Sequence, residues 1–180
     1  MNTEEFYIVV DVETSGPDPC GYALLSIGAC TLTQPQETIY IELKPDSRNF
    51  TKEALDISCL SMDELAASGL SPSEAMQTFA DWLNRINKDN KIPIFTAFNA
   101  AFDWMFVNTY FHRYLGYNPF GHKALDIKSC FMGLYHTRFD ETSHKALCEY
   151  YQICIDLSHH ALEDAINEAI IFKAILNEFS

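Results

Sequence analysis

Two carboxylates, Asp11 and Glu13, stand two residues apart at the end of the apolar run Phe6–Val12. Alternate side chains of an extended strand share one face, so both carboxylates point the same way from the strand's carboxyl end. Carboxylates this close repel each other unless a cation lies between them. The pair indicates a cation site, although a solvated acidic pair at a strand end is the simpler alternative.

The segment Thr14-Ser15-Gly16 follows these carboxylates directly. It places two hydroxyl groups and several backbone N–H groups next to the acidic pair. Such groups suit the binding of a terminal phosphate or a sugar hydroxyl. We therefore expect all three residues to contact a substrate.

A third carboxylate, Asp103, follows another apolar run, in the segment Phe98-Asn99-Ala100-Ala101-Phe102-Asp103. It falls in the first turn of a predicted helix, and it lies beside Asp11 if the preceding strand neighbours the first one. An aspartate there can simply interact with the helix dipole. Its apolar neighbours Phe102 and Trp104 favour a place in the acidic site instead.

The last group is Ser158-His159-His160-Ala161-Leu162-Glu163-Asp164, where Asp164 falls in the first turn of the closing helix. A histidine near a metal-bound water can act as a general base near neutral pH. Histidine and aspartate at a helix start can also be plain capping residues. By residue type alone, His159 and His160 fit the role of base equally well.

Apolar runs and periodicity predict the elements that position these groups. Strands are predicted over Phe6–Val12, Ala23–Leu32, Thr38–Leu43, Ile92–Phe98 and Ala124–Asp126. Helices are predicted after Ser61, from Ser71 to about Asn87, and over Ala101–Leu115, Ile127–Tyr135, Ser143–Tyr151 and His160–Phe179. The order predicts an α/β sandwich with an antiparallel meander at one edge of the sheet.

Length and charge limit the class of protein further. The chain has 180 residues, which suits one domain over 1–180, and a net charge of −13. No signal peptide and no apolar stretch of about 20 residues is found, so we expect a cytoplasmic protein without a membrane partner. The acidity argues against coating of a duplex, but not against binding of one strand end.

Three motifs of this sequence, D-x-E-T-[ST]-G, N-A-x-F-D and H-x₄-D, occur in this order over Tyr7–Ala169. The ordered set resembles the DEDDh 3′→5′ exonucleases, a family that includes proofreading exonuclease subunits and RNase T relatives. The resemblance implies an RNase H-like fold, with a mixed five-stranded sheet flanked by helices. It also implies a hydrolase that releases nucleoside 5′-monophosphates from the 3′ end of single-stranded RNA or DNA.

The resemblance assigns roles to the acidic residues. Asp11 would bridge two divalent cations, Mg²⁺ or Mn²⁺, and Glu13 and Asp164 would complete the site of the cation that binds the attacking water. Asp103 would support the second cation. His159 would accept the proton of that water, because the family pattern leaves four residues between histidine and aspartate and so selects His159 over His160.

Residues near the motifs are candidates for substrate binding. Leu24, Leu25, Asn99 and Phe102 are expected to contact the terminal nucleotide, as apolar and aromatic groups do in single-strand binders. Leu24, Leu25 and Phe102 fit a purely structural place in the core at least as well. The densest basic stretch, which could line the path of the strand, is Lys123, Lys128, Arg138 and Lys145.

Other functions were weighed against the exonuclease. A haloacid-dehalogenase-like phosphatase needs an aspartate where this chain has Glu13, and its lysine motif is not found. A catalytically silent RNase H-like adaptor for nucleic acid or protein would be favoured by loss of a catalytic carboxylate, and none is lost. A subunit of a larger assembly, a homodimer, the choice of RNA or DNA and the pathway all stay open.

Overall fold

The computed structural model describes residues 5–89, 91–153 and 157–178. The strands are β1 (Phe6–Thr14), β2 (Leu24–Thr31), β3 (Thr38–Glu42), β4 (Pro93–Ala97) and β5 (Ala124–Asp126). The helices are α1 (Lys52–Ser58), α2 (Met62–Ser68), α3 (Pro72–Ile86), α4 (Ala101–Leu115), α5 (Ile127–Tyr135), the 3₁₀ helix η1 (Phe139–Glu141), α6 (His144–Tyr151) and α7 (Ala161–Asn177). Among these residues, no helix has the length and apolar character needed to cross a bilayer.

The five strands form one mixed sheet in the order β3-β2-β1-β4-β5. β1 pairs antiparallel with β2, and β2 pairs antiparallel with β3, which makes the predicted meander. β4 and β5 continue the sheet on the other side of β1 in parallel. The predicted mixed five-stranded sheet is therefore confirmed, and β1 lies at its centre.

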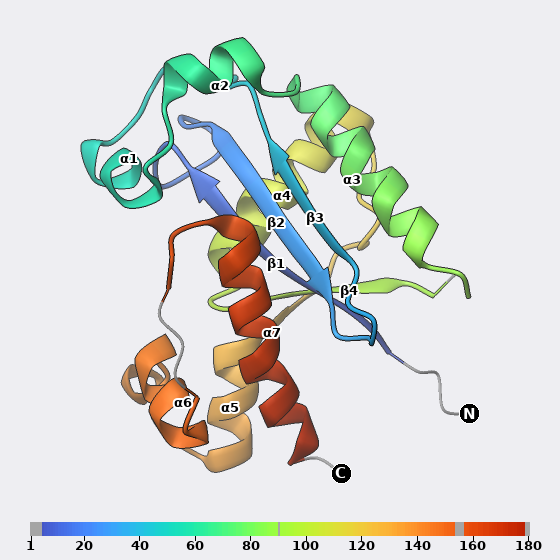
Figure 1. The fold of residues 1–180 in the computed structure, drawn as a ribbon, viewed down its shortest axis with the longest axis vertical. Helices are drawn as coiled ribbons and strands as arrows, with labels where there is room; N and C mark the ends of the chain where they lie inside the picture. The colour runs from blue at the N-terminus through green and yellow to red at the C-terminus, as the bar shows by residue number, and fades with distance from the viewer. Residues whose placement is uncertain (1–4, 90, 154–156, 179–180) are drawn as a thin grey trace.

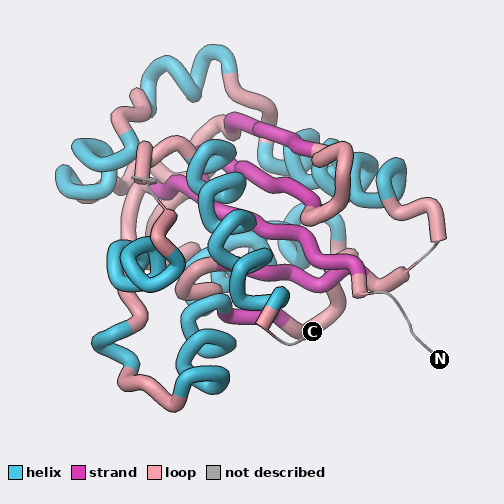
Figure 2. The backbone as a smooth tube through the Cα atoms, turned by 60° about the horizontal axis from the view of Figure 1, so that its bottom comes forward, coloured by secondary structure: helices cyan, strands magenta, loops and turns pink. Residues whose placement is uncertain are grey.

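Helices cover both faces of the sheet, as Figures 1 and 2 show. α7 packs on β1 and β2 on one face, next to α5 and α6, while α3 and α4 pack on the other face. The alternation of β1 divides its side chains between these layers. Val10 and Val12 enter the core under α3 and α4, and Val9 enters the core under α7. Asp11 and Glu13 consequently share the α7 face.

The two predicted capping residues, Ser61 and Ser71, stand at the starts of α2 and α3. Ser71 and Glu74 form a complete capping box at the start of α3, whereas at α2 Ser61 accepts the N–H of Glu64. Two short helices, α1 and η1, are not among the predicted elements. α1 begins at Thr51, whose hydroxyl accepts the N–H of Ala54, and with only seven residues it carries little helical periodicity.

Candidate active site

The carboxylates meet where β1 ends, and a glycine in the neighbouring strand lets them do so. Asp11 lies opposite Gly28 of β2 in the antiparallel register. A Cβ atom on Gly28 would lie 2.1 Å from the backbone nitrogen of Leu162 and 2.2 Å from the carbonyl carbon of Ala161. The first turn of α7 therefore packs directly on the backbone of β2. This contact brings Asp164 to the side of β1 that carries Asp11 and Glu13.

Three carboxylates form a group that fits a cation. One oxygen each from Asp11, Glu13 and Asp164 lies within 4.8 Å of the others. Asp164 is 4% exposed. Its oxygens accept the backbone N–H of Ser158 at 2.8 Å and that of His159 at 2.9 Å, which fixes the loop before α7. Grouped carboxylate oxygens are the hard ligands that Mg²⁺ and Mn²⁺ prefer.

Asp103 approaches the same place from α4. It is 4% exposed, and one of its oxygens accepts the backbone N–H of Val12, between the two strand carboxylates, at 3.2 Å. A pocket of 240 Å³ joins all four carboxylates. We call it the carboxylate pocket, and it is lined by Asp11, Val12, Glu13, Phe98, Asn99, Phe102, Asp103, Leu157, His159, Asp164 and Glu168.

Glu168 is a fifth carboxylate of this pocket, and the sequence analysis missed it. It is 4% exposed and lies one helical turn after Asp164 on α7, on the same face of the helix. Its side chain accepts the backbone N–H of Phe98 at 3.2 Å, so it holds the segment between β4 and α4. Its spacing of four residues from Asp164 could have indicated its place in the pocket, because residues four apart share one face of a helix.

Burial and the charges of neighbouring carboxylates raise the pKa values of Asp11, Glu13, Asp103 and Glu168. Burial, followed by the charges of Asp164 and Asp103, raises the pKa of Glu13 to about 8. Burial raises the pKa of Asp103 to about 7 against two backbone hydrogen bonds that lower it. Burial and then the charge of Glu168 hold the pKa of Asp11 well above its usual range. Without a cation these groups retain protons, and a bound cation would displace them.

The two adjacent histidines have different surroundings. His159 has a left-handed backbone, with φ of 56°, and lines the carboxylate pocket. His160 instead stacks its ring on that of Tyr40 of β3, with centroids 4.4 Å apart and planes at 25°. Of the two, only His159 is positioned to receive a proton from a water in this pocket.

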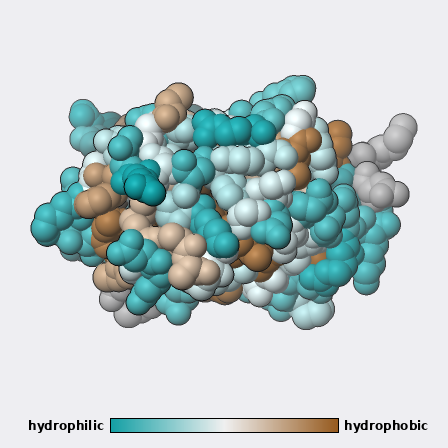
Figure 3. Space-filling view, turned by 90° about the horizontal axis from the view of Figure 1, so that it is seen from above, coloured by the Kyte–Doolittle hydropathy of each residue, from teal (hydrophilic) through white to brown (hydrophobic). Residues whose placement is uncertain are grey.

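A second pocket, of 430 Å³, adjoins the first and shares Val12, Glu13 and Phe102 with it. We call it the side pocket. Its remaining lining residues are Thr14, Gly16, Pro17, Thr51, Glu53, Ala54 and Ile57. The unpredicted helix α1 thus supplies one wall. Seen from above the view of Figure 1, apolar residues gather in small groups among hydrophilic ones (Figure 3).

The expected substrate residues divide into two sets. Thr14, Gly16 and Phe102 line the side pocket, and Asn99 lines the carboxylate pocket. Gly16 has no room for a side chain, because a Cβ atom would lie 2.2 Å from the ring of Tyr22.

The structure corrects the prediction that Ser15, Leu24 and Leu25 contact a substrate. All three are fully buried, so none can contact a substrate in this structure. The Ser15 hydroxyl donates to the carbonyl of Asn49 and accepts the N–H of Ala23, each at 2.8 Å. The two leucines point into apolar cores on opposite faces of the sheet, as their purely structural reading allowed.

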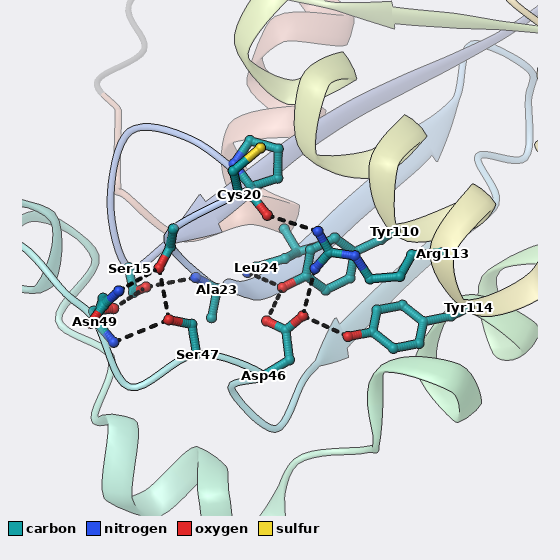
Figure 4. Close-up of polar contacts among 12 residues, drawn as sticks. Ser15, Cys20, Ala23, Leu24, Asp46, Ser47, Asn49, Tyr110, Arg113 and Tyr114 are labelled. Atoms are coloured by element: carbon teal, nitrogen blue, oxygen red, sulfur yellow. Dashed lines mark hydrogen bonds and ion pairs between the residues drawn. The ribbon is translucent and has the colours of Figure 1, made fainter.

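A polar network behind the side pocket fixes the loop that leads to α1 (Figure 4). Asp46 accepts hydrogen bonds from the hydroxyls of Tyr110 and Tyr114 and from the guanidinium of Arg113, all on α4. Further along the loop, the N–H of Thr51 donates to the carbonyl of Ser15 at 2.8 Å. α4 and the Ser15 segment therefore both hold the wall of the side pocket.

Known proteins resemble this chain over nearly its whole length. The sequence model of the RNase T family, described as exonuclease, matches residues 8–172. The 3′-5′ DNA exonuclease Cap18 of Escherichia coli is 42% identical over 176 residues, covering 97% of this chain and 94% of that protein. Ribonuclease T of Vibrio vulnificus (strain CMCP6) is 31% identical over 188 residues, covering 97% of this chain and 85% of that protein.

Solved structures share the fold at low sequence identity. The nuclease domain of 3′hExo, described as a DEDDh family member bound to rAMP, superposes with a TM-score of 0.79 at 13% identity, covering 98% of this chain and 94% of that one. Escherichia coli exonuclease I in complex with a dT13 oligonucleotide gives a TM-score of 0.71 at 19% identity, covering 96% of this chain and 41% of that one. The predicted RNase H-like fold is confirmed.

Proposed function

This chain belongs to the RNase T family and is a 3′→5′ exonuclease of the DEDDh kind, and from that premise we propose that it degrades single-stranded DNA from the 3′ end. The products would be nucleoside 5′-monophosphates. The relative at 42% identity is a DNA exonuclease by name, which favours DNA over RNA as the substrate. The observation that carries the proposal is the group of Asp11, Glu13 and Asp164 beside an open pocket.

The family depends on divalent cations, and the residues present fit them. Carboxylate oxygens gather without a lysine or arginine among the residues that line the carboxylate pocket in the described chain. We propose that Asp11, Glu13 and Asp164 would hold Mg²⁺ or Mn²⁺ and that Asp103 would support a second such ion. Such ions would stabilise charge on the attacking and leaving oxygens of an in-line displacement at phosphorus.

The protein's own residues would position the reactants and accept the proton. The unprotonated ring of His159 would take a proton from the attacking water, because it lines the carboxylate pocket and its backbone N–H is fixed by Asp164. The terminal nucleoside would occupy the side pocket. There the partly exposed Phe102 and the 43% exposed Ile57 offer apolar contacts to a base.

The test is a gel assay with single-stranded DNA and RNA labelled at the 5′ end, run with Mg²⁺, Mn²⁺ or a chelator. We expect a ladder that shortens from the 3′ end, requires the cation and is faster for DNA. Asp11→Ala, the control, should abolish the ladder. A faster RNA ladder would overturn the choice of sugar. No degradation of either strand would favour the silent adaptor.

A further inference from the structure

A group of aromatic and basic side chains from α5, η1, α6 and the segment after β4 borders the carboxylate pocket. The ammonium group of Lys128 on α5 lies 4.2 Å from the ring centroid of Phe139 on η1 and 5.9 Å from that of Phe98. The ring of His144 on α6 meets that of Phe98 edge-on, with centroids 5.6 Å apart and planes at 70°. We call these four residues the basic aromatic patch.

The patch is continuous with the active site. Phe98 lines the carboxylate pocket, and its backbone N–H is held by Glu168. The same ring belongs to the patch through its contacts with Lys128 and His144. A strand that leaves the carboxylate pocket across Phe98 would therefore pass over Lys128 and reach Phe139.

Among the described residues, Lys128 has no carboxylate partner, unlike Arg113 and Arg138. Arg113 pairs with Asp46 at 3.1 Å and Arg138 with Asp140 at 3.0 Å. No ion pair joins Lys128 to a carboxylate among the residues that the structure describes. Two ring faces hold its ammonium group in place without neutralising it, so the charge stays available to an anion.

Phe139 offers an apolar surface that the fold does not use. Its side chain is 59% exposed, although Lys128 lies over its ring. An exposed aromatic ring beside a fixed cation suits a chain that alternates bases with phosphates, since every unpaired base has a face that can stack. Duplex bases are already stacked on their neighbours, so the ligand that fits is a single strand.

We propose that the basic aromatic patch binds the strand upstream of the scissile phosphate, with Lys128 on a phosphate and Phe139 against a base. This inference rests on the proposed exonuclease function and adds the path that the substrate takes. The patch presents a ring and an ammonium group to the ligand. Neither of these groups recognises the hydrogen-bonding edge of a base. Binding there should therefore be tolerant of sequence.

The test compares two substrates with the same 3′ end, a dinucleotide and an oligonucleotide of about 12 nucleotides, a length within the range that single-strand binders cover. The dinucleotide has one nucleoside upstream of the scissile phosphate and lacks all the phosphates and bases beyond it. We expect Phe139→Ala to lower kcat/KM on the long substrate about five- to hundred-fold, the usual effect of losing one stacked base. Lys128→Ala should lower it too, and should reduce the slope of log binding against log salt by about 0.7.

The dinucleotide should be cut by both variants at the wild-type rate. Arg85→Ala is the matched control: it removes one exposed positive charge on α3, on the other face of the sheet, and should leave both substrates unaffected. Equal losses on the two substrates would mean that the patch only supports the fold. Unchanged cleavage of the long substrate would overturn the proposal outright.

A binding measurement separates this inference from the proposed function. Fluorescence anisotropy of the labelled long oligonucleotide in chelator requires no cleavage. If neither substrate is cut but Phe139→Ala and Lys128→Ala still weaken this binding, the proposed function fails and the patch stands. An acidic peptide of equal charge that binds as tightly as the oligonucleotide would identify the patch as a protein-binding surface instead.

Discussion

Asp46 and the carboxylate pocket are two places where acidic side chains are largely shielded from solvent, and they are organised in opposite ways. Asp46, with a side chain 15% exposed, receives hydrogen bonds from two tyrosine hydroxyls and an ion pair from Arg113. The carboxylates of the carboxylate pocket receive backbone N–H groups and one serine hydroxyl instead. No lysine or arginine lines this pocket within the described part of the chain.

The difference shows which acidic residues the fold satisfies by itself. A buried carboxylate needs hydrogen bonds and a countercharge, and the protein supplies both at Asp46. In the carboxylate pocket the protein supplies hydrogen bonds alone, and burial together with the charges of neighbouring carboxylates raises the pKa values of Asp11 and Glu168. The described residues supply no countercharge there, which agrees with the cation site that we propose.

The largest expected effect concerns His159, the proposed general base in the carboxylate pocket. His159→Ala should slow cleavage about 10²–10⁴-fold, the range for loss of a positioned general base. His160→Ala should leave the rate nearly unchanged, because its ring stacks on Tyr40. Rates of ladder formation measure both. Equal losses would refute the assignment of His159.

Glu168→Gln tests whether the pocket's excess charge serves a cation. The amide oxygen can still accept the N–H of Phe98, so the substitution removes charge and keeps the contact. We expect Mn²⁺ binding, measured by calorimetric titration, to weaken about 10- to 100-fold, as for groups that support a metal site. Asp46→Asn is the matched control. Unchanged Mn²⁺ affinity in Glu168→Gln would show that this carboxylate only holds the β4–α4 segment.

Asp46→Ala tests the carboxylate for which the protein supplies both hydrogen bonds and a countercharge. Loss of its partners should lower the melting temperature by about 5–10 °C, since hydrogen bonds to a charged group contribute about 1.5–3 kcal/mol and each kcal/mol is worth about 2–4 °C at this size. Cation affinity should not change. Asp56→Ala, which removes an exposed pair with Lys52, should have almost no effect on thermal unfolding. A similar fall in melting temperature in both variants would mean that the Asp46 network contributes no more to stability than an exposed ion pair.

The smallest effect is a pH dependence of the metal-free protein. Raised pKa values mean that the folded state binds more protons than the unfolded state, so stability is greatest at low pH and falls as pH rises. With the pKa of Glu13 at about 8 and that of Asp103 at about 7, the fall should span about pH 5 to 8. Melting temperatures in chelator measure it.

Excess Mn²⁺ should restore more stability at pH 8 than at pH 5, because protons compete with the cation at the lower pH. Glu13→Gln should flatten the pH dependence by a few degrees, while Asp46→Asn should leave its shape unchanged. A metal-free protein that gains stability from pH 5 to 8 would contradict the raised pKa values.

The sequence by itself determined most of the elements and part of the site. Period-two alternation in β1 set Asp11 and Glu13 on one face, and capping and helical spacing located α3, α4 and α7. These are local properties, because side-chain direction in a strand or helix follows from the backbone repeat. The ordered motifs added the family and the fold.

Only the tertiary structure decided which groups meet. Glu168 joined the pocket because α7 packs against Gly28, and α1 became a pocket wall through contacts with the distant Ser15 segment. Leu24 and Leu25 turned into the core, since residue type alone does not separate an apolar substrate contact from core packing. Such choices depend on which surfaces face each other across the fold, and a local pattern does not contain that information.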